Sequence, residues 1–248
     1  MTLNPEYEHL RQELEQLAHR YDNDGQLLFS GRNQVRLFTI NGQPIAVKRF
    51  RRLGLLRSAV YRYWRCSKAQ RAYDNALQLL KRHIATPAPI AWFGDGRTYY
   101  YASAVTDGRP VKGELIEREP YRADMVRPYA RFVATLHEKG ILHRDLNPTN
   151  VLFHTAADGA YTFELIDINR MRFYDDGPVP KSECMENLTL FWWLTDVYRD
   201  VLNAYAEARQ WTVADVAEAI AVKQSHDRRW VRRKTFTGKI KRLLRKKK

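Results

Sequence analysis

Cysteine and long apolar runs are both scarce in this sequence. Only two cysteines occur among 248 residues, and Cys66 and Cys184 have neither metal-ligand spacing nor a C-x-x-C pair, which argues against a zinc site or a disulfide framework. No stretch reaches the roughly 18 consecutive apolar residues of a membrane-spanning helix, and the N-terminus is polar and charged, unlike a signal peptide. We therefore expect a cytoplasmic protein with its own hydrophobic core.

Acidic residues are scarce in two parts of this chain, which has a net charge of +14. The stretch 49–71 holds eight Lys or Arg and no acid, and the tail from about residue 226 holds twelve with one acid. Positive charge gathered in this way favours an anionic partner such as acidic lipid, a phosphorylated sugar or nucleic acid. The last part of the tail, 232–248, also has the pattern of a basic amphipathic helix, which predicts either contact with an anionic membrane surface or a solvated terminus that packs on the protein.

One short segment carries most of the chemical information. Residues 141–153 read I-L-H-R-D-L-N-P-T-N-V-L-F, which reproduces the H-R-D-x-x-x-x-N catalytic loop of kinases. In that loop Asp145 accepts the proton of an attacking hydroxyl, and Asn150 holds magnesium. We expect His143 to hold the backbone of the loop rather than to act in catalysis, and Arg144 to be a cation beside Asp145 that keeps its carboxylate ionised.

Two strands that such a loop requires are present at the right places. The segment 44–50 reads P-I-A-V-K-R-F, so that Lys48 is predicted to hold the α and β phosphates of ATP. The segment 161–170 reads Y-T-F-E-L-I-D-I-N-R, so that Asp167 is predicted to bind magnesium together with Asn150. Lys48, Asp145 and Arg144 are thus the predicted catalytic residues, and the predicted cofactors are ATP and Mg²⁺.

Several usual kinase features are lacking. In place of G-x-G-x-x-G the chain has Ser30-Gly31-Arg32-Asn33, where we still expect the backbone near Gly31 and Asn33 to cover the phosphates. No glycine follows Asp167 as in D-F-G, and no A-P-E comes later, so a phosphorylation-switched activation segment is not supported. The helix expected to face Lys48 has Asp74 as its only acid, and its reading as a lysine partner or as a solvated residue stays open.

The remaining pattern predicts an α+β protein with the two-lobed, protein-kinase-like fold, as a single kinase-like domain over 1–248. A small β-rich N-lobe with an N-terminal helix covers 1–108, and a mainly helical C-lobe covers 109–248. Strands are expected at 26–30, 34–40 and 44–50, with a type I′ turn at Asn41-Gly42. Helices are expected over the following ranges: 4–20, 57–83 with a stripe of Ala72, Ala76, Leu77 and Leu80, 121–139, a single helix over 181–209, and a shorter one over 212–223.

The chain also resembles a known family, the bacterial lipopolysaccharide core kinases that act on Kdo or heptose. The resemblance covers roughly 28–187 and rests on these segments: A-V-K-R-F at 46–50, S-K-A-Q-R-A-Y at 67–73, T-P-A-P-I at 86–90, H-R-D-L-N-P-T-N at 143–150 and L-I-D-I-N-R at 165–170. It implies a cytoplasmic, membrane-peripheral enzyme that transfers the γ-phosphate of ATP to a sugar hydroxyl of the lipid-linked lipid A and inner-core region, with no nucleic-acid partner.

Two other interpretations stay open at this point. A small atypical, RIO-like protein kinase or an antibiotic-type phosphotransferase would use the same catalytic set. A pseudokinase that binds a polyanion through its basic stretches is the third interpretation, although a binding module has no need of all four residues Lys48, Asp145, Asn150 and Asp167.

Overall fold

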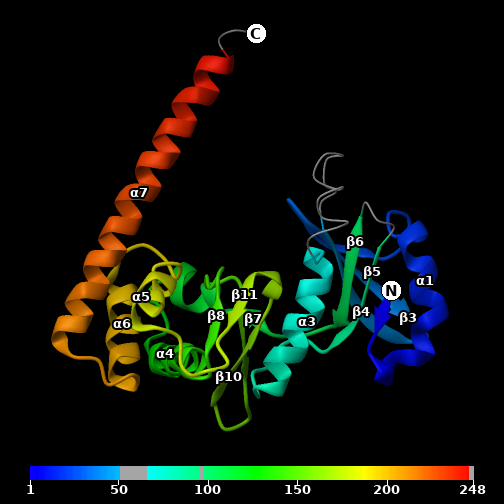
Figure 1. The fold of residues 1–248 in the computed structure, drawn as a ribbon, viewed down its shortest axis with the longest axis horizontal. Coiled ribbons are helices and arrows are strands. Elements are labelled where there is room, and N and C mark those ends of the chain that lie inside the picture. The colour runs from blue at the N-terminus through cyan, green and yellow to red at the C-terminus, as the bar shows by residue number, and fades with distance from the viewer. Residues whose placement is uncertain (51–65, 95–97, 246–248) are drawn as a thin grey trace. The chain divides into compact units, whose positions relative to one another are not determined.

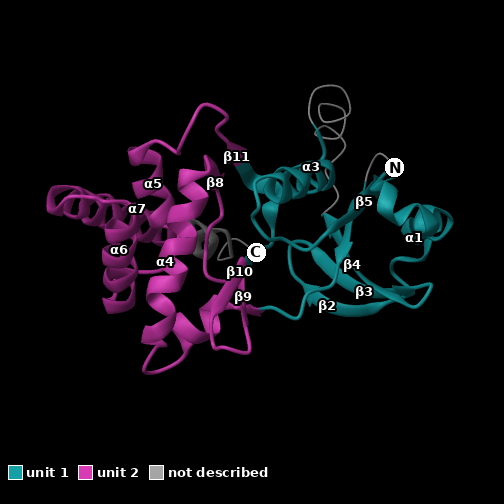
Figure 2. Cartoon of the chain, turned by 90° about the horizontal axis from the view of Figure 1, so that it is seen from below, with its two compact units in different colours: residues 1–108, 164–171 teal, residues 109–163, 172–248 magenta. Residues whose placement is uncertain are grey.

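The computed structural model describes residues 1–50, 66–94 and 98–245, the last ten by their backbone alone (Figure 1). The chain forms two compact units (Figure 2). The first contains residues 1–108 and 164–171, and the second contains 109–163 and 172–248. The sequence-based division had the same boundary after residue 108 but placed 164–171 with the C-terminal part. This short segment, which carries Asp167, lies with the first unit instead.

The first unit is built on a six-stranded sheet with the strand order β1-β5-β6-β4-β3-β2. Helices α1 and α3 cover opposite faces of this sheet (Figures 1 and 2). The sheet is antiparallel at each of its described pairings. Its elements are β1 (Thr2–Leu3), a 3₁₀ helix (Pro5–Leu10), α1 (Arg11–Arg20), β2 (Gln26–Ser30), β3 (Gln34–Ile40), β4 (Gln43–Phe50), α3 (Lys68–Lys81), β5 (Pro89–Gly94) and β6 (Tyr99–Ala104).

The strand predictions for this unit are confirmed. Strands β2 and β3 have the predicted bounds, and β4 begins one residue earlier than expected. The β3–β4 turn has positive φ at both Asn41 (50°) and Gly42 (79°), as a type I′ turn requires. Such a turn matches the right-handed twist of the flanking strands, so this hairpin is determined locally by its sequence.

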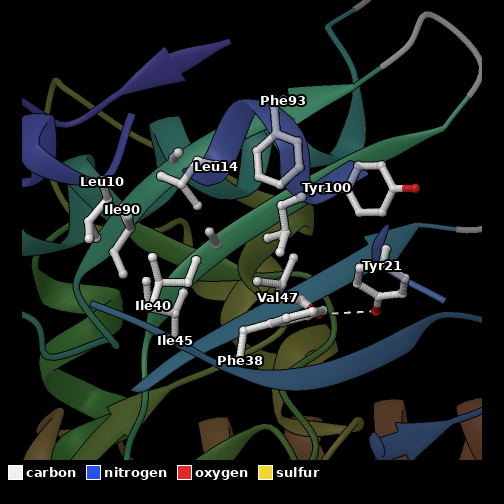
Figure 3. Packing of buried hydrophobic residues seen from close by; sticks show 13 residues of the cluster. Leu10, Leu14, Tyr21, Phe38, Ile40, Ile45, Val47, Ile90, Phe93 and Tyr100 are labelled. Carbon is white, nitrogen blue, oxygen red and sulfur yellow. Dashed lines mark hydrogen bonds between the residues drawn. The ribbon is translucent and has the colours of Figure 1, made fainter. Parts of the chain in front are cut away.

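Helix α1 packs its apolar side on the sheet (Figure 3). Leu10, Leu14 and Leu17 are fully buried, as their spacing predicts. Asn4 caps the 3₁₀ helix that precedes α1, because its side chain accepts a hydrogen bond from the Glu6 N–H. The predicted single helix over 4–20 is in fact a 3₁₀ helix over Pro5–Leu10, with non-helical backbone at Tyr7 inside it, followed by α1 from Arg11.

Tyr21 closes the same core at its other end. Its hydroxyl lies 3.2 Å from both the Gln34 and the Val47 carbonyl oxygens, and its ring packs against Phe38 and Tyr100 (Figure 3). Burial raises the pKa of the Tyr21 phenol to about 12, so the hydroxyl stays a hydrogen-bond donor at neutral pH. Tyr100 also stacks on Phe93, and it therefore belongs to the core.

Helix α3 begins at Lys68, where the Ser67 side chain accepts a hydrogen bond from the Gln70 N–H. The earlier start expected at Arg57, and most of the basic stretch 49–71, lie outside the described residues. The predicted stripe is half wrong, because Leu77 and Leu80 are 42% and 40% exposed. The helix faces the sheet with a neighbouring row of residues, which are Ala69, Ala72, Tyr73, Ala76 and Leu79.

The second unit is mainly helical. Its strands form a three-stranded sheet ordered β10-β9-β7 and a two-stranded sheet of β11 and β8. Its elements are β7 (Arg109–Pro110), a π-helical turn (Gly113–Glu117), α4 (Ala123–Glu138), β8 (Ile141–His143), β9 (Val151–Thr155), β10 (Tyr161–Leu165), a 3₁₀ turn (Ile168–Arg170), β11 (Met171–Phe173), α5 (Lys181–Leu188), α6 (Asp196–Ala208) and α7 (Val213–Arg245); the residues 164–171 of these elements count with the first unit.

Helix α4 confirms its prediction and leads directly into the loop of interest. Its buried residues include Val126, Tyr129, Val133 and Leu136. The helix ends before Gly140, which has φ +66° and approaches the backbone so closely that a Cβ there would lie 2.5 Å from the Tyr174 carbonyl oxygen. Only glycine tolerates both conditions.

The predicted single helix over 181–209 is wrong, because residues 189–195 separate α5 from α6. At this break the Thr189 carbonyl oxygen accepts a hydrogen bond from the Lys223 ammonium rather than from a helical N–H. The backbone is extended at Thr195, where α6 begins. Lys223 of α7 thus donates to a carbonyl oxygen that would accept a backbone N–H if the helix continued.

The two separate C-terminal helices expected at 212–223 and 232–248 are also wrong. A single helix, α7, runs from Val213 to Arg245. No proline occurs in this range and Gly238 is its only glycine, so nothing in the sequence stops the helix after Lys223. The apolar side predicted for the tail lies among side chains beyond Thr235, outside the described ones. No described helix is both long and apolar enough to cross a bilayer.

Candidate active site

The loop between β8 and β9 is held by its own side chains. His143 is fully buried. Its Nδ1 accepts a hydrogen bond from the Asp145 N–H at 3.1 Å, and its carbonyl oxygen accepts one from Asn187 Nδ2 at 2.9 Å. The imidazole therefore fixes the backbone of the loop, as the sequence predicted.

Asp145 is the residue on which this loop converges. Its carbonyl oxygen accepts hydrogen bonds from the Asn147 N–H and from Asn150 Nδ2, each at 2.8 Å. Asn147 Nδ2 lies 3.3 Å from the Asp145 carboxylate. Because the amide nitrogen of Asn150 is engaged, its oxygen is the atom that remains to bind a cation.

Arg144 lies in the same loop but faces solvent. Among the described residues it forms no ion pair with Asp145 or with any other acid. No direct contact therefore supports the expected electrostatic effect of Arg144 on the Asp145 carboxylate. The catalytic role of Arg144 stays a prediction.

Lys48 and Asp167 come together in the first unit. Val47 points into the core beneath α1, so Lys48, the next residue of β4, points to the opposite face of the sheet. There its Nζ lies 2.6 Å from Asp167 Oδ1. Asn169 Nδ2 donates to the same oxygen, whereas no described residue donates to Asp167 Oδ2. The second carboxylate oxygen is therefore available to a cation.

The segment that carries Asp167 is tied to the rest of the first unit by its backbone. The Leu165 N–H donates to the Ala85 carbonyl oxygen at 3.0 Å, and the Thr86 hydroxyl donates to the Leu165 carbonyl oxygen at 2.8 Å. Asp167 itself adopts the left-handed conformation, with φ 53° and ψ 42°, which costs an L-residue free energy unless the surroundings impose it.

Helix α3 contributes a residue that the sequence analysis missed. The candidate lysine partner, Asp74, is exposed, and the ion pair of Lys48 is with Asp167. The next residue, Asn75, faces inward, and its Nδ2 donates to the Ile168 carbonyl oxygen at 2.6 Å. The sequence held one signal for this: Asn75 lies one turn from Ala72 and Leu79, which are both buried.

The expected phosphate-covering loop is the tight turn between β2 and β3. Within it the Gly31 N–H donates to the Asn33 carbonyl oxygen at 3.0 Å. This donor is therefore already used inside the turn. The nucleotide-binding roles of Gly31 and Asn33 stay predictions.

The predicted site residues thus form two groups. Lys48 and Asp167 are paired in the first unit, whereas Asp145 and Asn150 are joined in the second. The first group offers a fixed cation and a carboxylate oxygen, and the second offers a carboxylate and an amide oxygen. Such oxygens are the ligands that Mg²⁺ prefers, so the donor set fits magnesium with a phosphate-bearing nucleotide.

Known proteins resemble the part of the chain that contains the loop of Asp145. Residues 113–222, which include the loop of Asp145, match the model of the lipopolysaccharide kinase (Kdo/WaaP) family. The resemblance to the Kdo/WaaP kinases is confirmed. A 3-deoxy-D-manno-octulosonic acid kinase of Vibrio parahaemolyticus is 24% identical over 172 residues, which are 65% of this chain and 70% of that protein.

A solved structure extends the likeness to almost the whole chain. The structure of WaaP in complex with acyl carrier protein superposes with a TM-score of 0.63 at 16% identity, covering 92% of this chain and 99% of that one. At this identity the match establishes the fold, which is the predicted α+β, protein-kinase-like one.

Protein kinases match over a smaller part. Human calcium/calmodulin-dependent protein kinase type IV is 37% identical over 73 residues, which are 29% of this chain and 15% of that kinase. The chain spans less than a fifth of the length of the protein kinases that it matches. By sequence and by fold it is similar to kinases, the phosphotransferases whose acceptor is an alcohol group.

Proposed function

We propose that the protein is an ATP-dependent kinase that phosphorylates a sugar hydroxyl, of Kdo or of heptose, in the inner core of lipopolysaccharide. The observation that carries the proposal is the loop of Asp145, in which Asn150 is anchored to the Asp145 carbonyl oxygen at 2.8 Å. This bond joins the residue that offers a carboxylate to the residue that offers an amide oxygen, within one short loop. Phosphoryl transfer is mostly positioning and charge neutralisation, and such a loop supplies both.

Each residue has a role that its surroundings support. Lys48 would hold the phosphates of the nucleotide, and Asp167 and Asn150 would hold magnesium through their available oxygens. Bound Mg-ATP would supply the γ-phosphoryl group and the charge that neutralises it. Asp145 would orient the acceptor hydroxyl and take its proton. Lys48 Nζ lies 2.6 Å from Asp167 Oδ1, so the proposed phosphate-binding cation and the proposed metal-binding carboxylate are adjacent.

The acceptor is argued from the family and from charge. The family match spans the loop of Asp145, and the relative from Vibrio is named for Kdo phosphorylation. The acceptor region of lipid A and the inner core is acidic, which suits a chain with net charge +14. Because that acceptor is lipid-linked, we also propose that the protein works at the inner face of the cytoplasmic membrane.

Transfer of radiolabelled phosphate from ATP to Kdo-lipid A and to a heptose-extended core tests this proposal. Asp145→Ala should lower transfer about 10²–10⁴-fold, the range for loss of a general base. Glu218→Ala removes an exposed acid of α7 and is the matched control, with transfer like wild type. Absence of transfer from wild type to both acceptors, with Mg-ATP bound normally, contradicts the proposal.

A second candidate is a protein kinase or a small-molecule phosphotransferase of the antibiotic type. The identity to protein kinases around the same loop favours it. It predicts transfer to a protein or aminoglycoside acceptor that also depends on Asp145. Acceptor screening with wild type and Asp145→Ala separates the two candidates.

A further inference from the structure

Tryptophan side chains are exposed at the break between α5 and α6. Trp192 and Trp193 are 37% and 38% exposed, although the neighbouring Phe191 is buried. Two adjacent tryptophans at the surface are unusual, because each leaves a large apolar area in water. Their exposure therefore needs an explanation beyond packing.

Helix α7 brings a third tryptophan to the same place. The ring of Trp230 lies 4.6 Å from that of Trp193 in an edge-to-face arrangement. The Lys234 ammonium lies 3.9 Å from the centre of the Trp230 ring. Aromatic rings and a cation from two separate elements thus form one continuous surface within the second unit.

A buried lysine holds these two elements together. Lys223 is 1% exposed, and its ammonium donates to the Thr189 carbonyl oxygen at 3.1 Å and to the Asp227 carboxylate at 2.8 Å. Its bonds join α7 to the residues just before Trp192. The aromatic surface is therefore built into the fold and does not depend on a chance side-chain arrangement.

Positive charge lies beside Trp230 on helix α7. Residues 228–234 read R-R-W-V-R-R-K, with five basic residues and no acid. Arg233 and Lys234, three and four residues after Trp230, lie on the same face of the helix as Trp230, and both are exposed. A surface with apolar aromatic rings and such a charge is complementary to the headgroup region of an anionic bilayer, where tryptophan prefers to lie and basic residues meet lipid phosphates.

We propose that Trp192, Trp193 and Trp230, with Arg233 and Lys234, form a surface, the Trp–Arg surface, that docks on an anionic lipid bilayer. This Trp–Arg surface lies within the described part of the chain, upstream of most of the basic tail. This proposal rests on the proposed function only in one respect: the surface would bring the enzyme to a lipid-linked acceptor.

The Trp–Arg surface is connected to the loop of Asp145. The Lys112 ammonium lies 6.0 Å from the centre of the Trp192 ring, and the Lys112 N–H donates to the Pro148 carbonyl oxygen at 3.0 Å. One residue thus contacts both the docking surface and the catalytic loop. A bilayer that holds Trp192 would hold that loop near the membrane as well.

Vesicle binding tests the proposal without any acceptor or nucleotide. Full-length protein is sedimented with vesicles of phosphatidylethanolamine and phosphatidylglycerol, and with vesicles of phosphatidylcholine alone. We expect binding to the first only. Trp192→Ser with Trp193→Ser should weaken it about tenfold, by loss of apolar contact. Arg233→Gln with Lys234→Gln should weaken it about thirtyfold at low salt.

Two controls keep the result interpretable. Leu77→Ser with Leu80→Ser removes apolar side chains of similar exposure from α3 and should leave vesicle binding unchanged. Wild-type tryptophan fluorescence should be quenched by brominated phosphatidylglycerol in the bilayer, a readout that needs no variant and therefore no assumption about folding.

Three outcomes would overturn the proposal. The first is equal vesicle binding by wild type and the tryptophan variant. The second is no quenching by brominated lipid. The third is binding of poly-glutamate as tight as that of vesicles and equally sensitive to the tryptophan changes, which would assign the surface to an acidic protein. Failure of the proposed kinase function shows only in the transfer assay, so the two can be told apart.

Discussion

Asn75 gives the sharpest test of how Asp167, the proposed metal ligand, is positioned. Its Nδ2 donates to the Ile168 carbonyl oxygen at 2.6 Å, directly after Asp167. A hydrogen bond of this kind contributes about 1 kcal/mol net, and an unsatisfied carbonyl raises the cost of losing it to about 2 kcal/mol. If that free energy acts on the position of Asp167, Asn75→Ala should weaken Mg-ATP binding between about fivefold and thirtyfold.

Calorimetric titration of ATP with and without magnesium measures this effect. Binding without magnesium should change less, because Lys48 lies on β4 and does not depend on Asn75. Asn75→Asp should be the more severe change, since its carboxylate cannot donate and adds negative charge next to a carbonyl oxygen. Gln78→Ala, an exposed position of the same helix, is the matched control. Mg-ATP binding by folded Asn75→Ala within twofold of wild type would refute the reasoning.

Three further predictions concern stability. Burial lowers the pKa of His137 to about 4, below its ordinary value in the unfolded chain, so protonation of this imidazole favours unfolding. Its contribution to the free energy of unfolding is fully present above pH 6.5 and should fall by about 3 kcal/mol as the pH drops to 4. Urea unfolding across this range checks it, and His137→Gln should flatten the profile. Tyr21→Phe removes the hydroxyl that donates to the Val47 carbonyl oxygen and should lower the free energy of unfolding in urea by about 1 kcal/mol. An unchanged free energy of unfolding would mean that this hydrogen bond does not stabilise the fold. Gly140→Ala sets a Cβ against the Tyr174 carbonyl oxygen and should cost about 2 kcal/mol or more in the same assay; an unchanged midpoint would mean that the backbone there relaxes freely.

The parts of the fold that the sequence predicted correctly are those governed by neighbouring residues. The hairpin turn at Asn41-Gly42 needs only the backbone preferences of two residues. The loop of Asp145 is similar, because its hydrogen bonds run mainly among His143, Asp145 and Asn150, which are close in the chain. The sequence motif therefore predicted the local structure of this loop, and its chemistry stays a prediction.

The parts that were missed depend on residues far apart in the sequence. Which row of α3 is buried is decided by where the sheet lies, so Leu77 and Leu80 look like core residues in the sequence and are exposed in the structure. Asn75 acquires its role from Ile168, 93 positions away. No helical pattern contains that information, because a hydrogen bond between distant segments arises only once both are packed.

By itself, then, the sequence determined the α+β class and the locally encoded hairpin and loop, and it supplied the prediction of the catalytic residues. Only the tertiary structure decided which side chain of α3 reaches the Asp167 segment. It likewise decided where the helix after Lys181 breaks, through the bond from Lys223 to Thr189. The physical reason is the same in each case: backbone preference and motif chemistry act over a few residues, whereas the choice of buried face and the capture of a distant carbonyl depend on how the folded elements meet.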